Sequence, residues 1–262
     1  MKRTLFLLPL VLLLSLTRCG GGQTGPVIPP AGSGSSSSGG TVGSGPAAPA
    51  ASATLAGKIT FEGTAPPPKK IQMGSDPVCA KKAKDPVTED VVVNGGALAN
   101  VIIYVSSEVN NTFTLPTEAI TIDQNGCHYI PHSFTLMAGQ KLTIKNSDDT
   151  LHNIHAFGVT NAEFNTGQPV PTSNDHVFDK AEMPLPFKCD VHKWMSAFAG
   201  VFNHPYHSVS KADGTYEFKL APGSYEITAW HETLGTQKMK VEVKDGQKTD
   251  LNFTFKAAAS AD

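Results

Sequence analysis

The sequence predicts an all-β protein, a β-sandwich accompanied by a second small β-sandwich. Apolar and polar residues alternate in runs such as residues 142–145, where Leu and Ile alternate with Thr and Lys. Gly-containing turn signals at residues 213–214, 222–223 and 245–246 separate such runs, as is typical of antiparallel strands. The predicted strands cover residues 57–61, 98–105, 119–123, 133–138, 141–146, 151–157, 186–190, 196–203, 215–220, 224–230, 238–243 and 250–255. Only residues 78–85 favour a short helix.

The N-terminus has the features of an export signal. Two basic residues precede an apolar run over residues 5–16, which is too short to span a bilayer comfortably. Residues 16–19, Leu-Thr-Arg-Cys, resemble a bacterial lipobox, although a small residue is usual where Arg stands. We expect a lipoprotein-type signal peptide over residues 1–18 and lipidation of Cys19. The protein would then be anchored to a membrane, in the periplasm or at the cell surface. The alternative is secretion after cleavage elsewhere.

A segment of low complexity follows the signal. Residues 20–53 consist almost entirely of Gly, Ser, Ala, Pro and Thr, and such a segment buries too little apolar surface to offset its loss of conformational entropy. We therefore expect residues 19–53 to be a disordered linker, about 30 Å long as a flexible coil.

The folded part divides unevenly. Residues 54–107 and 207–257 contain too few strands to close separate cores, but together they have the size of a domain. We predict that they form one discontinuous sandwich, into which a domain spanning residues 108–206 is inserted; the alternative is three pieces packed in sequence order. This chain resembles carboxypeptidase-regulatory-like domains, which are transthyretin-like sandwiches. The resemblance lies in residues 57–61, 213–218 and 221–227. That resemblance implies no catalysis.

One short segment carries a metal-ligand pattern. Cys189, His192 and Met195 follow one another at C-x2-H-x2-M spacing. Sulfur ligands suit Cu(I), imidazole suits both oxidation states of copper, and two imidazoles with a thiolate and a weak thioether are typical of blue copper sites. His152, at the start of a predicted strand, offers the second imidazole.

These residues resemble those of the cupredoxins, most closely the amicyanin type, over about residues 110–205. The resemblance implies a Greek-key sandwich holding one copper ion per chain through His152, Cys189, His192 and Met195. It also implies that Asn153 braces the residue after the cysteine. Asp190 stands there in place of the usual Ser or Thr, which would alter the hydrogen bonding around the metal.

The same resemblance suggests where electrons would enter. In cupredoxins the histidine of the ligand loop lies near the surface within an apolar patch, and here that residue is His192. We expect Trp194 to belong to this electron-transfer patch, with Pro184, Leu185 and Pro186 as further candidates. A c-type cytochrome or an exported dehydrogenase would be a suitable transient partner.

Cysteine usage suggests a cross-link. When the lipidation candidate Cys19 and the ligand Cys189 are set aside, Cys79 and Cys127 remain as an even pair in an oxidising compartment. We expect a disulfide between them; the alternative is two free thiols.

Three classes of function compete: electron transfer, redox catalysis, and copper storage or delivery. We expect no enzyme activity, since four ligands leave no substrate position and the sequence contains no H-x-H pair, no second cysteine in the ligand loop, and no G-x-S-x-G or H-E-x-x-H motif. The methionines form no cluster that favours storage, but delivery remains the alternative. A net charge of −2 gives no expectation of nucleic-acid binding.

The other histidines have weaker claims to metal. His155 lies three residues after His152, so in a strand it faces the opposite side and a structural role is expected. His128 and His132 could form a second metal site, but packing and hydrogen bonding are favoured. We assign no function to His176, His204, His207 or His231.

Overall fold

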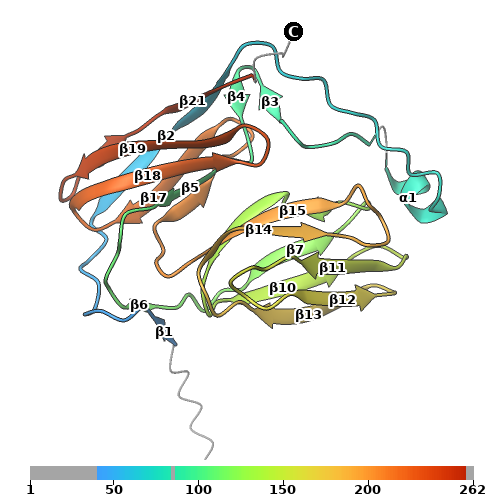
Figure 1. The fold of residues 1–262 in the computed structure, drawn as a ribbon, viewed down its shortest axis with the longest axis horizontal. Helices are drawn as coiled ribbons and strands as arrows, with labels where there is room; N and C mark the ends of the chain where they lie inside the picture. The colour runs from blue at the N-terminus through green and yellow to red at the C-terminus, as the bar shows by residue number, and fades with distance from the viewer. Residues whose placement is uncertain (1–39, 84–85, 258–262) are drawn as a thin grey trace, which may run out of the picture. The chain divides into compact units, whose positions relative to one another are not determined.

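The computed structural model describes residues 40–83 and 86–257, and it confirms the all-β class (Figure 1). The described residues belong to one compact unit. Within them, no helix has the length and apolar character that crossing a bilayer requires. The expected signal peptide over residues 1–18 and the expected lipidation site Cys19 lie outside the described residues.

One sandwich is built from residues 120–202. Its strands are β7 (Ile120–Gln124), β8 (Tyr129–Ile130), β9 (Ser133–Met137), β10 (Lys141–Asn146), β11 (His152–Ala156), β12 (Phe164–Gln168), β13 (Thr172–Val177), β14 (Glu182–Lys188) and β15 (Ser196–Phe202). The two sheets have the orders β13-β10-β7-β8 and β12-β11-β14-β15-β9, with parallel pairs β10–β7 and β15–β9. Inward side chains of both sheets, such as Ile144 and Phe187, share one core, which we call the ligand-side core.

A second sandwich flanks this one in the chain. Its strands are β2 (Ala53–Glu62), β3 (Val93–Asn94), β4 (Ala97–Leu98), β5 (Ile102–Val105), β16 (His207–Val209), β17 (Thr215–Leu220), β18 (Gly223–His231), β19 (Gly235–Val243), β20 (Lys248–Asp250) and β21 (Phe253–Lys256). The sheets are β16-β5-β18-β19 and β17-β2-β4-β3, and β20 and β21 also pair with β2. The predicted domain borders and the likeness to transthyretin-like modules stay predictions.

The predicted disordered linker is wrong for its C-terminal part. Within it, β1 (Thr41–Val42) pairs with β6 (Phe113–Thr114). The carbonyl of Pro46 accepts a backbone hydrogen bond from Thr112 at 2.8 Å. A segment of Gly, Ser and Pro residues can order in this way because backbone pairing requires no apolar side chains.

The single helix in the described residues is α1 (Pro77–Lys82), and it packs against the ligand-side core. The predicted domain border at residue 107 would instead place this helix with the second sandwich. Asp76 caps it, since its Oδ1 accepts from the backbone N–H groups of Val78 and Cys79 at 2.8 and 3.1 Å. Cys79, buried in this core, forms a disulfide with Cys127 in the β7–β8 turn, which confirms the expected pair. The disulfide fixes α1 to the end of the sandwich that carries the ligand loop.

His132, immediately before β9, makes polar contacts with the second sandwich. Only 7% exposed, it hydrogen-bonds through Nε2 to Glu232 in the β18–β19 turn. Its Nδ1 lies 3.8 Å from Glu89. These contacts agree with the expected role in hydrogen bonding and packing.

We expect His132 to make stability depend on pH. Burial lowers the pKa of His132, but the hydrogen bond that His132 donates to Glu232 and the charges of Glu232 and Glu89 raise the pKa above the ordinary value. A raised folded-state pKa means that protonated His132 stabilises the fold below the unfolded pKa of about 6.5. That stabilisation is lost as the pH rises through the folded-state pKa. In urea unfolding, the deficit of His132→Gln relative to the wild type should therefore shrink as the pH rises; a deficit independent of pH would contradict this.

Candidate metal centre

The ligand loop joins β14 to β15 and is closed by its own backbone. Cys189 N–H donates to the Met195 carbonyl at 3.2 Å, and Met195 N–H donates to the His192 carbonyl at 2.9 Å. The backbone N–H of His192 also donates to Cys189 Sγ at 3.3 Å. All three side chains of the predicted ligands in this loop are buried, with exposed fractions of 1, 3 and 1% for Cys189, His192 and Met195. The short loop therefore turns a thiol, an imidazole and a thioether into the protein interior.

The second imidazole comes from β11, the strand that pairs with β14 in the same sheet. His152 opens β11 and is fully buried. Its Nδ1 lies 2.9 Å from Nδ1 of His192, which in turn lies 4.0 Å from Cys189 Sγ. One donor atom from each of these three residues falls within 4.8 Å of the others. The arrangement fits a copper ion by the chemistry of its donors, two imidazole nitrogens and one thiolate, with Met195 in the same loop.

Asn153 and Asp190 brace this group. Asn153 Oδ1 accepts from the backbone N–H of Asp190 at 2.7 Å and lies 3.3 Å from Cys189 Sγ. Its Nδ2 donates to the Asp190 carboxylate at 2.9 Å, and Asn165 Nδ2 donates to the same oxygen at 2.8 Å. Asn165 and then His155 hold the pKa of Asp190 below its ordinary value. The acidic side chain therefore adds hydrogen bonds on the outer side of the loop.

His155 faces away from the ligand group. Its Nδ1 lies 3.1 Å from an Asp190 oxygen, its Nε2 hydrogen-bonds to Glu163, and its ring stacks on Phe157 with centroids 3.9 Å apart. Burial lowers the pKa of His155, but Glu163 and Asp190 outweigh it and raise the pKa. The structural role expected from strand geometry agrees with these contacts.

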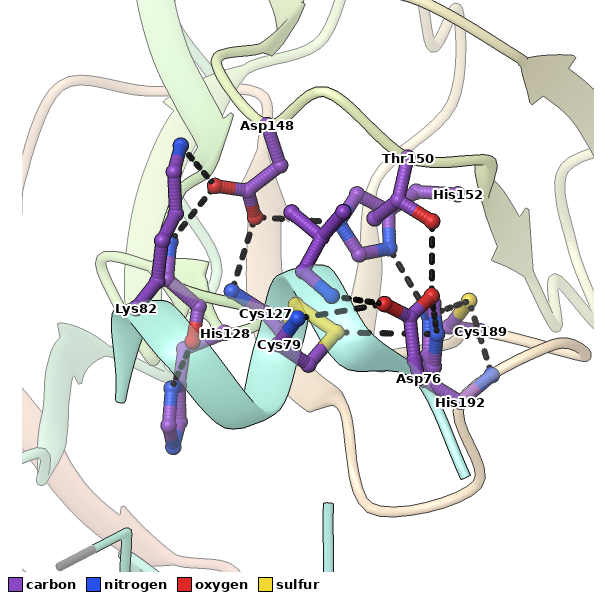
Figure 2. The surroundings of a disulfide bond; sticks show 12 residues. Asp76, Cys79, Lys82, Cys127, His128, Asp148, Thr150, His152, Cys189 and His192 are labelled. Carbon is purple, nitrogen blue, oxygen red and sulfur yellow. Dashed lines mark hydrogen bonds and ion pairs between the residues drawn. A yellow bond between two sulfur atoms is a disulfide. The ribbon is translucent and has the colours of Figure 1, made fainter. Parts of the chain in front are cut away.

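Two carboxylates that sequence reasoning missed complete the surroundings of the imidazoles (Figure 2). His152 Nε2 lies 3.0 Å from Asp148 Oδ2, and His192 Nε2 lies 3.1 Å from Asp76 Oδ2. Asp148 lies in the turn just before His152, and this closeness in the sequence was the one available sign that a carboxylate contacts an imidazole. Asp76 is more than a hundred residues from His192 in the chain, so nothing local connects them.

The protonation of these carboxylates follows from their contacts. Burial raises the pKa of Asp76, but hydrogen bonds from Thr150, from the backbone N–H groups of Cys79 and Val78, and from His192 lower it to about 2. The pKa of Asp148 is also lowered, because hydrogen bonds from Lys82 and backbone N–H groups outweigh burial. Both residues are carboxylates at neutral pH.

The prediction that His192 lies near the surface is wrong. His192 is covered by the segment around α1: its Nε2 lies 3.7 Å from Cys79 Sγ, in addition to the contact with Asp76. Trp194 is half-buried, its ring centroid lies 5.0 Å from that of His192, and its Nε1 donates to the Cys127 carbonyl at 3.1 Å. Leu185, a candidate for the apolar patch, is a fully buried core residue. The segment that covers His192 is distant from the ligand loop in the chain, so the sequence of the loop did not reveal this cover.

No family model matches the chain, and no curated protein matches it. Among solved structures, a copper-containing nitrite reductase from Thermus scotoductus SA-01 is similar at 16% identity and a TM-score of 0.31, covering 38% of this chain and 25% of the reductase. A purple cupredoxin from Nitrosopumilus maritimus is similar at 21% identity and a TM-score of 0.27, covering 31% of this chain and 98% of that one.

An oxidised mutant of amicyanin is similar at 19% identity and a TM-score of 0.30, covering 38% of this chain and 90% of that one. TM-scores this low do not establish a shared fold or a shared function.

Proposed function

We propose that this protein binds one copper ion through His152, Cys189, His192 and Met195 and that it transfers electrons. The observation that carries the proposal is the buried group of two imidazole Nδ1 atoms and one free thiol, with Nδ1 atoms 2.9 Å apart. Copper bound there would supply one-electron redox chemistry. The residues of the chain would orient the ion, exclude water from it and limit the rearrangement between its oxidation states.

Burial favours electron transfer over the alternatives. Each proposed ligand has an exposed fraction of 3% or less, which leaves little room for a substrate or for a ligand of an acceptor protein. An enzyme would need an open coordination position, and a delivery protein would need ligands that exchange readily. Copper storage or delivery remains the second candidate. A c-type cytochrome or an exported dehydrogenase is the proposed partner, and anchoring through Cys19 in the periplasm or at the cell surface is the proposed location.

Copper loading tests the proposal. The wild-type protein, loaded with Cu(II), should show an intense visible thiolate-to-copper charge-transfer band. Cys189→Ser should abolish the band without unfolding the protein, because Cys189 is the one free cysteine among the described residues. His155→Ala is the matched control, since that imidazole points away from the group and its loss should leave the band in place.

A wild-type protein that stays colourless with Cu(II) would contradict the ligand assignment. Stopped-flow mixing separates the two candidate functions. Rapid electron exchange with a c-type cytochrome, together with slow loss of copper to a chelator, supports electron transfer. Slow electron exchange with rapid loss of copper would favour delivery instead.

A further inference from the structure

We propose that Asp76 and Asp148 are positioning residues of the metal centre, which fix both imidazoles with Nδ1 toward the metal and favour the divalent over the monovalent ion. This inference rests on the copper site proposed above. It concerns two residues outside the ligand set, one of them delivered by α1.

The first step is the tautomer of each imidazole. The two Nδ1 atoms face each other at 2.9 Å, whereas each Nε2 faces a carboxylate oxygen at 3.0 or 3.1 Å. A carboxylate only accepts hydrogen bonds, so each Nε2 must carry the proton. A neutral imidazole has one N–H group, and Nδ1 is therefore left with the lone pair that a metal needs.

The second step is the rigidity of the carboxylates. Asp148 is fully buried and accepts from the backbone N–H groups of Gly126 and Cys127 at 2.9 and 2.7 Å and from Lys82 Nζ at 2.8 Å. These bonds leave it one orientation toward His152.

Asp76 is held in a comparable way. Its Oδ1 caps α1, and its Oδ2 accepts from the Thr150 hydroxyl at 2.6 Å. The helix itself is fixed by the Cys79–Cys127 disulfide beside His192. The imidazole of His192 is therefore oriented by a part of the chain that is cross-linked in place.

The third step is charge. Negative charges next to the imidazoles attract the divalent ion more than the monovalent ion, and this attraction is strong where water is excluded. Lys82 offsets the charge of Asp148. Asp76 has no lysine or arginine partner in the described part of the chain. Removing the charge of Asp76 should therefore have the larger effect on the balance between Cu(II) and Cu(I).

Asp76→Asn is the decisive variant. Asparagine also caps helices and removes the charge, but its single oxygen can accept either from the backbone N–H groups of α1 or from Nε2, so one of these two contacts is lost together with the charge. We expect the ratio of Cu(II) affinity to Cu(I) affinity to fall by tenfold or more. For a one-electron couple this corresponds to a rise of about 59 mV or more in the reduction potential of the copper site. Asp148→Asn should shift the potential in the same direction by less. Asp175→Asn is the control, because its exposed carboxylate binds Thr143 and Lys141 on the outer face of the sandwich.

A second measurement needs no metal. Long-range proton–nitrogen NMR of the apo-protein should show both His152 and His192 protonated at Nε2, and Asp76→Ala should weaken that preference at His192 alone. Wild-type imidazoles protonated at Nδ1, or a potential of Asp76→Asn equal to that of Asp175→Asn, would overturn this inference. Either result leaves the copper site standing if the wild-type charge-transfer band is present. Absence of that band counts against the copper site, and the tautomer measurement still decides on the positioning role.

Discussion

Replacing Cys79 and Cys127 together with alanine is expected to lower the free energy of unfolding by about 4 kcal/mol. The two residues are 48 apart in the sequence, and opening a loop of that length returns entropy to the unfolded chain. Both side chains are fully buried, so the variant also loses some packing. Urea unfolding of the oxidised wild type and the variant measures the difference. Cys189→Ala is the matched control, since it removes a buried cysteine that forms no cross-link.

The same double variant should uncover His192. A helix of six residues has little stability of its own, so α1 depends on its attachments to the sandwich. Once the disulfide is gone, only contacts such as those of Asp76 and Lys82 hold it. We expect His192 in the apo-protein to react faster with diethyl pyrocarbonate, as mapped by mass spectrometry. If His192 in the variant reacts no faster than in the wild type, these polar contacts alone would be sufficient to hold α1 over His192.

The sequence predicted those features that depend on local patterns. Alternation located strands such as β10, because residues one apart face opposite sides of a sheet whatever the rest of the chain does. The spacing of Cys189, His192 and Met195 predicted a ligand loop, because three donors within seven residues can converge without help from another segment. The disulfide followed from composition, once the other cysteines had been assigned.

Features that depend on tertiary contacts could not be predicted from the sequence. β12 and β13 are polar and rich in Asn, Ser and Thr. β12 pairs with β11 and β13 pairs with β10 through backbone hydrogen bonds, so no alternation of apolar and polar residues marked these strands in the sequence. The cap over His192 could not be predicted from the ligand loop because α1 lies far away in the chain. Asp76 gave a sign of a helix start, with proline after it, but nothing in the sequence linked that start to an imidazole.

We expect Asp148→Ala to cause the largest loss of stability of any single substitution among the residues surrounding the imidazoles, about 3–5 kcal/mol. The carboxylate is fully buried, and its removal leaves the backbone N–H groups of Gly126 and Cys127 and the imidazole of His152 without their acceptor. Unsatisfied buried donors incur the full cost of desolvation. Urea unfolding of the apo-protein measures this without contributions from a bound metal.

Comparison with an exposed aspartate isolates the effect of burial. Asp175 also binds a lysine and a hydroxyl group, but it lies at the surface, where water replaces lost partners, so Asp175→Ala should cost much less. A double-mutant cycle with Lys82→Met separates the ion pair from the remaining contacts of Asp148. We expect Asp148→Ala to remain strongly destabilising even when Lys82 is already replaced, because the backbone donors and His152 still lose their acceptor. If the loss disappears in that background, the ion pair with Lys82 would account for the stability, and the turn that holds Asp148 against His152 would be supported by charge rather than by its buried hydrogen bonds.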